Sequence, residues 1–448
     1  MKNYDSYKET GIDLIGKIPN HWEVRRIANL GKFTKGKGIS RDEILPTGIP
    51  CIRYGEIYTD YERIVYLPKS FISKESSQRS EVIKKGDVLF TGSGETVEDI
   101  GKSVVYYGED DIYAGGDIII LKLNDGFSPL FISYLMNCNF VNQQKANGGR
   151  GEIIVHIYPK QIREIFVSIP PLAEQSIIAT FLDYKTQQID ELITKKQRLI
   201  ELLKEERTAL INHAVTKGLD PNVPMKDSEI EWLGEIPEYW EVSKIKYCAE
   251  INNDVLGDST PEDFEFKYVD IGIITFGKLN GLPEKLLFKN SPSRARRILY
   301  EGDTIISTVR TYLKAILFID NSLNGFVGST GFAVLTPTKK FMPKFLFYMM
   351  TSQQIVEQIC SISVGVSYPA TNASDIGNIS IWLPPISEQD KIVNFIEGRI
   401  NYLTNIEERS LKEIELISEY KASLINETVT GKIDVRKYSI QNNHEERI

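Results

Sequence analysis

The chain has 448 residues, of which 42% are hydrophobic and 25% are charged, and its formal net charge is −8. This composition predicts a globular protein with more than one hydrophobic core. No apolar run reaches the roughly 18 residues that a membrane helix needs, which argues against a membrane protein. The first residues also lack the apolar stretch of a secretion signal, so we expect a cytoplasmic protein.

The cysteines and histidines argue against metal and disulfide chemistry. Cys51, Cys138, Cys248 and Cys360 lie far apart and form no CxxC pair, which argues against a zinc ribbon and against a disulfide-stapled fold. None of the four histidines stands at a metal-ligand spacing from another His or Cys. We therefore expect reduced thiols, no metal and no cofactor.

The negative net charge argues mildly against nucleic-acid binding, because phosphate contacts need Lys and Arg. Binding depends on local patches, however, and three segments are basic: residues 24–41, 141–163 and 285–314. From residue 384 on, acidic residues outnumber basic ones, 12 to 9. The charge is thus partitioned, with positive stretches in the parts that we expect to be globular, although any one cluster could arise by chance.

The first half of the chain opens on Ile18-Pro-Asn-His-Trp-Glu-Val24. The glycine-rich stretch from Gly31 to Gly38 comes close to the phosphate-binding pattern GxxxxGK[ST], but it ends in glycine and lacks the hydroxyl that would bind Mg²⁺. We interpret it as a flexible basic loop able to approach DNA, with an ordinary solvated turn as the equal alternative. Residues 112–123 have the pattern of strands, and residues 129–146 that of a short helix.

A long helix is predicted after Pro170-Pro171, because the chain from Glu174 to about Val215 contains no Pro or Gly. Apolar residues, among them Ile189, Leu192, Leu199 and Leu203, recur in it at alternating steps of four and three, which is typical of a coiled coil and places them toward a partner helix. About 40 residues make a rod on the order of 60 Å, too long for one small domain to cover. We therefore expect it to pair with a second helix, rather than to pack on its own domain alone, and to end near Gly218.

The second half repeats the first. Ile18-Pro-Asn-His-Trp-Glu-Val24 returns as Ile236-Pro-Glu-Tyr-Trp-Glu-Val242, and Ile169-Pro-Pro-Leu-Ala-Glu-Gln175 returns at nearly the same offset as Leu383-Pro-Pro-Ile-Ser-Glu-Gln389. The second motif leads into another long helical segment that should end near Gly431. The ends of the halves match closely while their interiors diverge, which is what one frame holding two different readers would show.

Catalytic motifs are weak or missing. Glu265-Phe-Lys267 with Asp258 faintly resembles a nuclease triplet, but the other half lacks one, and neither Pro-Pro pair has the Asn and the aromatic residue of an amino-methyltransferase motif. We interpret Glu174 and Glu388 as acids that complement a helix dipole, and Gln175 and Gln389 as residues that join helix to domain.

These motifs resemble those of the specificity subunits of type I restriction-modification systems. The residues that carry the resemblance are Ile18-Pro-x-x-Trp22 and Ile236-Pro-x-x-Trp240, the two Pro-Pro-x-x-Glu-Gln motifs at residues 170–175 and 384–389, and Leu-Ile-Asn at residues 210–212 and 424–426. The resemblance implies a non-catalytic protein whose two target recognition domains each read half of a split double-stranded DNA sequence. It also implies methyltransferase subunits and a restriction (translocase) subunit as partners.

We therefore predict an α+β protein with pseudo-twofold repeats, in which two similar globular target recognition domains are joined by two long helices forming an antiparallel coiled coil. The predicted segments are a first recognition domain (1–169), a first spacer helix (170–218), a second recognition domain (219–383), a second spacer helix (384–434) and a tail (435–448).

Basic residues and one tyrosine in loops are the predicted DNA contacts: Lys35, Lys37, Arg41, Arg150, Arg294, Arg296, Arg297, Arg310, Tyr312 and Lys314. The alternative function is a coiled-coil interaction protein or a DNA-mimic inhibitor without specific DNA binding, which the negative net charge would favour. A single-chain nuclease-methyltransferase is the other alternative, but it would need cofactor motifs.

Overall fold

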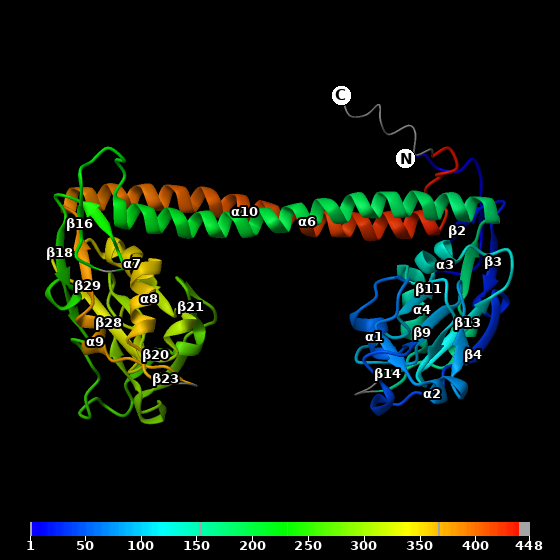
Figure 1. The fold of residues 1–448 in the computed structure, drawn as a ribbon, viewed down its shortest axis with the longest axis horizontal. Coiled ribbons are helices and arrows are strands. Elements are labelled where there is room, and N and C mark those ends of the chain that lie inside the picture. Colours follow the sequence, from blue (N-terminus) through cyan, green and yellow to red (C-terminus); the bar gives the residue numbers. More distant parts are fainter. Residues whose placement is uncertain (1, 152–154, 231, 366–367, 439–448) are drawn as a thin grey trace. The chain divides into compact units, whose positions relative to one another are not determined.

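A computed structural model describes residues 2–151, 155–230, 232–365 and 368–438. The chain forms two compact units (Figure 1). The first contains the residues up to Lys196 and those from Lys412 on, and the second runs from Gln197 to Leu411. Each unit therefore contains one globular domain and one part of each of the two long helices.

The first globular domain is built on a five-stranded sheet in the order β4-β13-β9-β11-β6. These strands are β4 (Gly31–Lys35), β13 (Ile118–Leu123), β9 (Val88–Thr91), β11 (Ser103–Tyr106) and β6 (Ile64–Val65). Side chains alternate between the two faces of a strand. Val88 and Phe90 enter one buried cluster and Leu89 enters another, so this sheet is covered on both faces.

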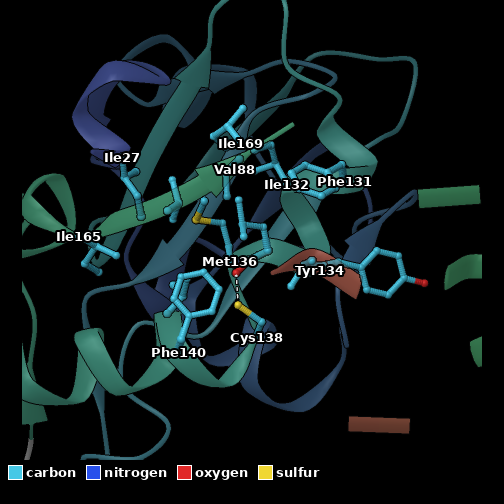
Figure 2. Close-up of a cluster of buried hydrophobic side chains, with 14 of the residues drawn as sticks. Ile27, Val88, Phe131, Ile132, Tyr134, Met136, Cys138, Phe140, Ile165 and Ile169 are labelled. Atoms are coloured by element: carbon cyan, nitrogen blue, oxygen red, sulfur yellow. Dashed lines mark hydrogen bonds between the residues drawn. The ribbon is translucent and has the colours of Figure 1, made fainter. Parts of the chain in front are cut away.

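Figure 2 shows the cluster on one face, where Val88 meets Phe131, Ile132 and Met136 of the helical layer. That layer consists of α3 (Pro129–Leu135), α4 (Asn139–Gly148) and α5 (Pro159–Glu164). The single helix predicted over residues 129–146 is thus two helices. The chain turns between them at Cys138, whose thiol donates to the carbonyl oxygen of Leu135 at 2.9 Å.

A second sheet, in the order β7-β5-β12-β8, covers the other face of the first. Its strands are β7 (Ser70–Ile72), β5 (Ile49–Ile52), β12 (Ile112–Ala114) and β8 (Glu81–Ile83). Strands β5 and β12 are parallel, and the other pairs are antiparallel. The strands predicted within residues 112–123 are therefore β12 and β13, which belong to different sheets.

Short elements complete the first unit. They are two small helices, α1 (Tyr54–Thr59) and α2 (Lys74–Gln78), and three strand pairs: β1 (Tyr7–Glu9) with β2 (Lys17–Pro19), β3 (Glu23–Arg26) with β15 (Phe166–Ile169), and β10 (Ser93–Gly94) with β14 (Val155–His156). Strands β3 and β15 join the start of the domain to the segment that leads into the long helix.

The second unit repeats this order of strands. Its sheet β19-β28-β25-β26 consists of Ala249–Ile251, Phe332–Pro337, Thr304–Ser307 and Ile316–Phe318, and its sheet β23-β20-β27-β24 consists of Glu284–Leu287, Glu265–Val269, Val327–Ser329 and Ala295–Ile298. The alternation also returns, because Ile306 enters one cluster and Ile305 the other.

The remaining strand pairs and α-helices of the second unit also have counterparts in the first, apart from the pair β21 (Ile274–Thr275) and β22 (Lys278–Leu279). They are β16 (Met225–Asp227) with β17 (Glu235–Pro237), β18 (Glu241–Lys244) with β29 (Ser380–Leu383), and the helices α7 (Pro343–Thr351), α8 (Gln353–Ser361) and α9 (Ala373–Gly377). The α+β prediction with a duplicated domain is confirmed.

The two long helices are α6 (Leu172–Lys217) and α10 (Ile386–Val429), and they are antiparallel within each unit (Figure 1). In the first unit Asp190 of α6 forms a salt bridge with Lys421 of α10 at 2.7 Å, and Lys196 of α6 forms one with Glu413 of α10. In the second unit Arg207 pairs with Glu407 at 3.1 Å. The partner on α10 moves toward lower numbers as α6 advances, as an antiparallel pair requires.

The predicted apolar stripe is displaced by one residue in the middle of α6. Leu192 and Leu199, predicted to face the partner helix, are 44% and 39% exposed. Ile193 is half-buried instead, and Ile200 is buried. Both predicted ends are confirmed, because Gly218 and Gly431 follow the helices with φ of 76° and 75°, which other residues rarely adopt. No helix among the described residues is long and apolar enough to cross a membrane.

The repeated motifs meet at a buried carboxylate. Glu174, in the first turn of α6, accepts hydrogen bonds from the indole N–H of Trp22 at 3.0 Å and from the Tyr4 hydroxyl, and it contacts His21 Nε2 at 2.7 Å. A β-carbon on Gly431 would come within 3.2 Å of the Trp22 ring, so the end of α10 packs against the same group. We call this arrangement the Trp–Glu clamp.

The second unit contains the same clamp. Glu388 of α10 accepts from the Trp240 indole at 3.1 Å and from the Tyr239 hydroxyl at 3.0 Å, and Gly218 at the end of α6 packs on the Trp240 ring. The sequence indicated only a helix-dipole role for the two glutamates. The role predicted for the glutamines is seen in detail. Gln175 accepts from the amide of Ser128 before α3, and Gln389 accepts from that of Met342 before α7, each at 2.8 Å.

Replacing the clamp carboxylate should destabilise the unit that contains it. We expect Glu174→Gln to lower the free energy of unfolding by about 2 kcal/mol, because hydrogen bonds to a buried charge are among the stronger ones. Glu388→Gln should lower it by less, because that carboxylate is only half-buried. Urea denaturation would measure the loss. Glu191→Gln and Glu408→Gln, which change exposed glutamates on the same helices, are the controls. A loss no larger than that of the controls would contradict the clamp.

A second prediction concerns Lys145, which belongs to a predicted basic segment but is fully buried. Its ammonium donates to the Met136 carbonyl at 2.6 Å and to Asn142 Oδ1 at 3.2 Å. Burial lowers the pKa of Lys145 to about 7. Between that value and the ordinary pKa near 10.4, the unfolded chain binds one proton more than the folded chain, so stability should rise with pH from about 7 to 9.

Lys145→Ile should remove this pH dependence, because isoleucine does not titrate. Isoleucine is chosen because Ile359 is the buried residue at the equivalent position of the second unit. Urea midpoints at pH 7, 8 and 9 would be compared for the two proteins. The difference between them isolates Lys145 from other titrating groups and should change by up to about 1.4 kcal/mol per pH unit. Parallel pH profiles for wild type and variant would show that Lys145 is charged inside the fold.

Candidate nucleic-acid interface

The first predicted basic segment is more ordered than the sequence indicated. Residues 31–35 form strand β4 rather than a flexible loop, and the exposed Lys35 ends it. Gly36 follows in close contact with Gly115, because a β-carbon there would collide with the Gly115 carbonyl oxygen. Lys37 is exposed, with Glu81 at 4.0 Å as a weak partner. The backbone thus presents the two lysines from a fixed position.

Arg41 is also exposed, at the rim of a cleft of about 520 Å³ in the first unit. Arg53 and Glu56, which form an ion pair at 2.9 Å, line the same cleft, together with Tyr54 and Asp60. The cleft is therefore of mixed charge. Arg41 has no ion-pair partner within the described ranges, so its guanidinium is available to a ligand at the surface.

Arg150 is bonded through its backbone to His156, a contact that the sequence did not indicate. Its backbone exchanges two hydrogen bonds with His156, at 3.0 and 2.8 Å. His156 belongs to β14, which pairs with β10 in the turn after the central strand β9. Ser93 Oγ lies 3.0 Å from His156 Nδ1, and the exposed Tyr158 stacks on the His156 ring at 6.4 Å. Glu152, the one acidic residue in the sequence of the basic segment 141–163, lies outside the described residues.

In the second unit, Arg294 is engaged by its neighbours. Its guanidinium contacts Asp270 at 2.9 Å and donates to the Tyr268 hydroxyl at 3.1 Å. Burial pushes the pKa of Asp270 up, but the Gly272 amide, the Tyr268 hydroxyl and Arg294 more than offset this effect, so the pKa lies below its usual value. The carboxylate is thus held ionised, and Arg294 is its counter-ion.

Arg296 and Arg297 lie on strand β24 and are only partly exposed. The Arg296 guanidinium lies over the Phe288 ring at 4.7 Å. Burial lowers the pKa of Arg297, and its Nε has no hydrogen-bond partner among the described residues. The predicted arginine cluster is therefore not one patch, since each of the three side chains has a different environment.

Arg310, Tyr312 and Lys314 are brought together on one turn that links β25 to β26. All three are exposed. The Arg310 amide donates to the Pro369 carbonyl at 2.7 Å, and its guanidinium lies over the Tyr368 ring at 4.5 Å. Tyr368 is 61% exposed, and it was not among the predicted contacts.

Arg150 and Arg310 lie in the same repeated arrangement but on opposite members of it, because Arg150 is equivalent to Val364 and Arg310 is equivalent to Gly94. The bridge between Val309 and Ala370 repeats the pairing of β10 with β14, and the bridge between Val364 and Ala370 repeats that between Arg150 and His156. Two more bonds match: Ile157 donates to Gly92 at 3.0 Å, and Thr371 to Thr308 at 2.8 Å. In each unit the turn after the central strand thus packs against a bridged pair of segments, which we call the returning hairpin. Its bridge joins Arg150 to His156 in the first unit and Val364 to Ala370 in the second. The nearly constant offset of the sequence repeat could have indicated that these two hairpins are equivalent.

No group of three or more His, Cys, Asp or Glu side chains in the described part of the chain could hold a metal ion. All four cysteines are free thiols, three of them buried. A cleft of about 850 Å³ in the first unit is lined by Arg63, Tyr134, Asp183 and Lys421, and ion pairs already neutralise part of it.

The family model described as type I restriction modification DNA specificity domain matches residues 19–202 and 237–416, one copy for each unit. The two matches together cover most of the chain, which belongs to this family. The resemblance noted from the Pro-Pro-x-x-Glu-Gln motifs and the Ile-Pro-x-x-Trp motifs is therefore confirmed. The predicted function is confirmed as well: the chain is a type I restriction-modification specificity subunit with two repeated DNA recognition domains. The alternative function, a coiled-coil interaction protein or a DNA-mimic inhibitor, is not supported.

Relatives match over nearly the full length. The chain is 26% identical over 436 residues to the specificity subunit of the type I restriction enzyme MjaVIII of Methanocaldococcus jannaschii, covering 94% of this chain and 95% of that protein. It is 20% identical to the EcoKI specificity subunit of Escherichia coli K12, covering 93% and 90%.

Solved structures share the fold. A chain from a structure of a type I restriction-modification system, described for its complex assembly and conformational transition, superposes with a TM-score of 0.70 at 15% identity and covers 93% of this chain and 99% of that one. The HsdS subunit from Thermoanaerobacter tengcongensis gives a TM-score of 0.57 at 16% identity, with coverage of 93% and 98%.

Proposed function

We propose that each globular domain reads one half of a split double-stranded DNA target, and that the chain supplies sequence recognition without a catalytic step of its own. Methylation and cleavage would come from methyltransferase subunits and a restriction subunit that assemble on it, in the cytoplasm where the DNA lies. The named relatives are specificity subunits of restriction enzymes, which supports partners of this kind.

The observation that carries the proposal is one frame with two different surfaces. Both units keep the Trp–Glu clamp, the order of the two main sheets and the turn that follows the central strand. The same turn is acidic in the first unit, with Glu95 and Glu98, and basic in the second, with Arg310 and Lys314. Base edges are distinguished by donors and acceptors, so different side chains on one scaffold would read different half-sites.

The five predicted segments fit this division of labour. We propose that residues 1–169 and 219–383 are the reading domains and that residues 170–218 and 384–434 form the spacer. The proposed tail, residues 435–448, lies for its greater part outside the described residues. Helical residues that face away from the partner helix would receive the methyltransferase subunits. Phe395 and Tyr402, exposed on α10, are examples.

The proposed DNA contacts differ in kind. Lys35, Lys37, Arg41 and Arg150 in the first unit, and Arg310, Tyr312 and Lys314 in the second, are exposed. They would contact DNA directly. Arg294, Arg296 and Arg297 are held by neighbours or partly buried, and we propose that they shape the surface and add positive potential.

Exchange of residues 238–383 for those of a relative with a different target tests the modular reading. The hybrid, assembled with methyltransferase subunits, should methylate a split sequence in which one half-site is new and the other is unchanged. Sequencing of methylated DNA would identify both. If both half-sites changed, the two units would not read independently.

The basic strand end of the first unit yields a second test. The double variant Lys35→Gln, Lys37→Gln should weaken DNA binding at all sequences and lower the slope of log affinity against log salt by up to about 2, because each phosphate contact contributes about 0.9. Lys8→Gln, an exposed lysine on β1, is the matched control. An unchanged slope in the assembled complex would remove Lys35 and Lys37 from the interface.

A further inference from the structure

The turn between β25 and β26 is strained at both ends. Arg310 precedes a short 3-10 segment, Thr311–Leu313, and Lys314 follows it. Arg310 has φ of 51° and Lys314 has φ of 53°. Only two other non-glycine residues of the described chain, Glu229 and Asn252, have positive φ. A left-handed conformation is unfavourable for residues with a β-carbon, and it persists where the surroundings enforce it.

The enforcing contacts come from the returning hairpin. The Arg310 amide donates to the Pro369 carbonyl at 2.7 Å, and Thr311 Oγ1 lies 2.8 Å from Ser363 Oγ. These bonds hold the turn on one side while its tip stays in solvent. Strain maintained in this way on a recognition domain points to a ligand-facing role.

The tip exposes apolar and aromatic side chains beside positive charge. Tyr312 and Leu313 are 51% and 52% exposed, and Val364 on the hairpin is 81% exposed. Phosphate contacts need charged or hydrogen-bonding groups, so apolar side chains would not contribute to a surface that contacted phosphates alone. Thymine, by contrast, presents a methyl group in the major groove, and apolar side chains recognise it.

Arg310 is prepared for a directional contact. Its guanidinium lies over the Tyr368 ring at 4.5 Å, which fixes the plane of the group and leaves its edge N–H donors free. It forms no ion pair among the described residues, whereas Arg294 of the same unit is bound to Asp270. A planar fork of donors matches the O6 and N7 acceptors of guanine in the major groove.

We propose that the turn from Arg310 to Lys314 enters the major groove, where Arg310 reads a guanine of the second half-site and Tyr312 and Leu313 contact neighbouring bases. This inference rests on the proposed function, in which each unit reads one half-site. The equivalent turn of the first unit, residues 94–98, carries Glu95 and Glu98 and no Arg or Lys. The guanine contact is therefore specific to the second unit.

The experiment compares two glycine variants in the chain assembled with methyltransferase subunits. Arg310→Gly and Lys314→Gly both relieve a left-handed residue, so both proteins should fold at least as well as wild type. DNA from a randomised plasmid library would be sequenced for methylation. We expect Arg310→Gly to lower the preference for guanine at one position of one half-site roughly tenfold to hundredfold, and to leave the other half-site intact.

Lys314→Gly should keep every base preference, since a lone ammonium at the edge of the turn would contact the backbone. If Arg310→Gly kept the guanine preference, or weakened methylation of all sequences equally, Arg310 would not read a base and the inference would be wrong. If the wild-type complex selected no split sequence, the proposed function itself would fail, which is a different result from either.

Discussion

A carboxylate at the start of each long helix, buried in the first unit and half-buried in the second, holds the rest of this structure in place. Glu174 and Glu388 each accept the indole N–H of a fully buried tryptophan, Trp22 and Trp240, that lies at the far end of the same half of the sequence. A buried ionised group is costly unless donors surround it, and here Trp and Tyr side chains supply them. The glutamate thus joins the first turn of its helix to the tryptophan near the start of the domain. The end of the other long helix packs on the same tryptophan.

This constraint separates the frame from the reading surface. The clamp uses the same tryptophan and glutamate in both halves, and the order of strands and the burial of the central sheet on both faces recur with it. The turn after the central strand lies outside these contacts, so its side chains can change without loss of the fold. That is why Thr96 and Glu98 can stand in one unit where Tyr312 and Lys314 stand in the other. Divergence is concentrated where packing does not restrict it.

The same separation explains what could be predicted from the sequence. The duplicated motifs and the long segments free of Pro and Gly indicated the two domains and both helices, because clamp residues and helix periodicity are local in sequence. The stripe on α6 was displaced in its middle, where Ile193 and Ile200 rather than Leu192 and Leu199 face inward. Leucines occur on both sides of that segment, so spacing alone did not decide between two registers.

The predicted surface was less complete for a related reason. Charge alone selected Arg310 together with Arg294, but the Asp270 partner of Arg294 is distant in sequence and emerges only in the fold. Lys145 was counted in a basic segment although its side chain is buried. Tyr368 carries no charge and was passed over, yet it orients Arg310. Long-range packing decides which charges are available, and no local pattern encodes it.

The two units differ in how the end of a long helix connects to the start of the domain. In the second unit the chain runs covalently from the end of α6 through residues 219–224 to β16. In the first unit the segment after α10 meets the start of the chain instead, where the Asp434 amide donates to the Lys2 carbonyl at 2.8 Å. A hydrogen-bonded contact thus stands where the other unit has a peptide linkage. Each unit contains the beginning of one long helix and the end of the other, so the helical part of each unit comes from both halves of the sequence.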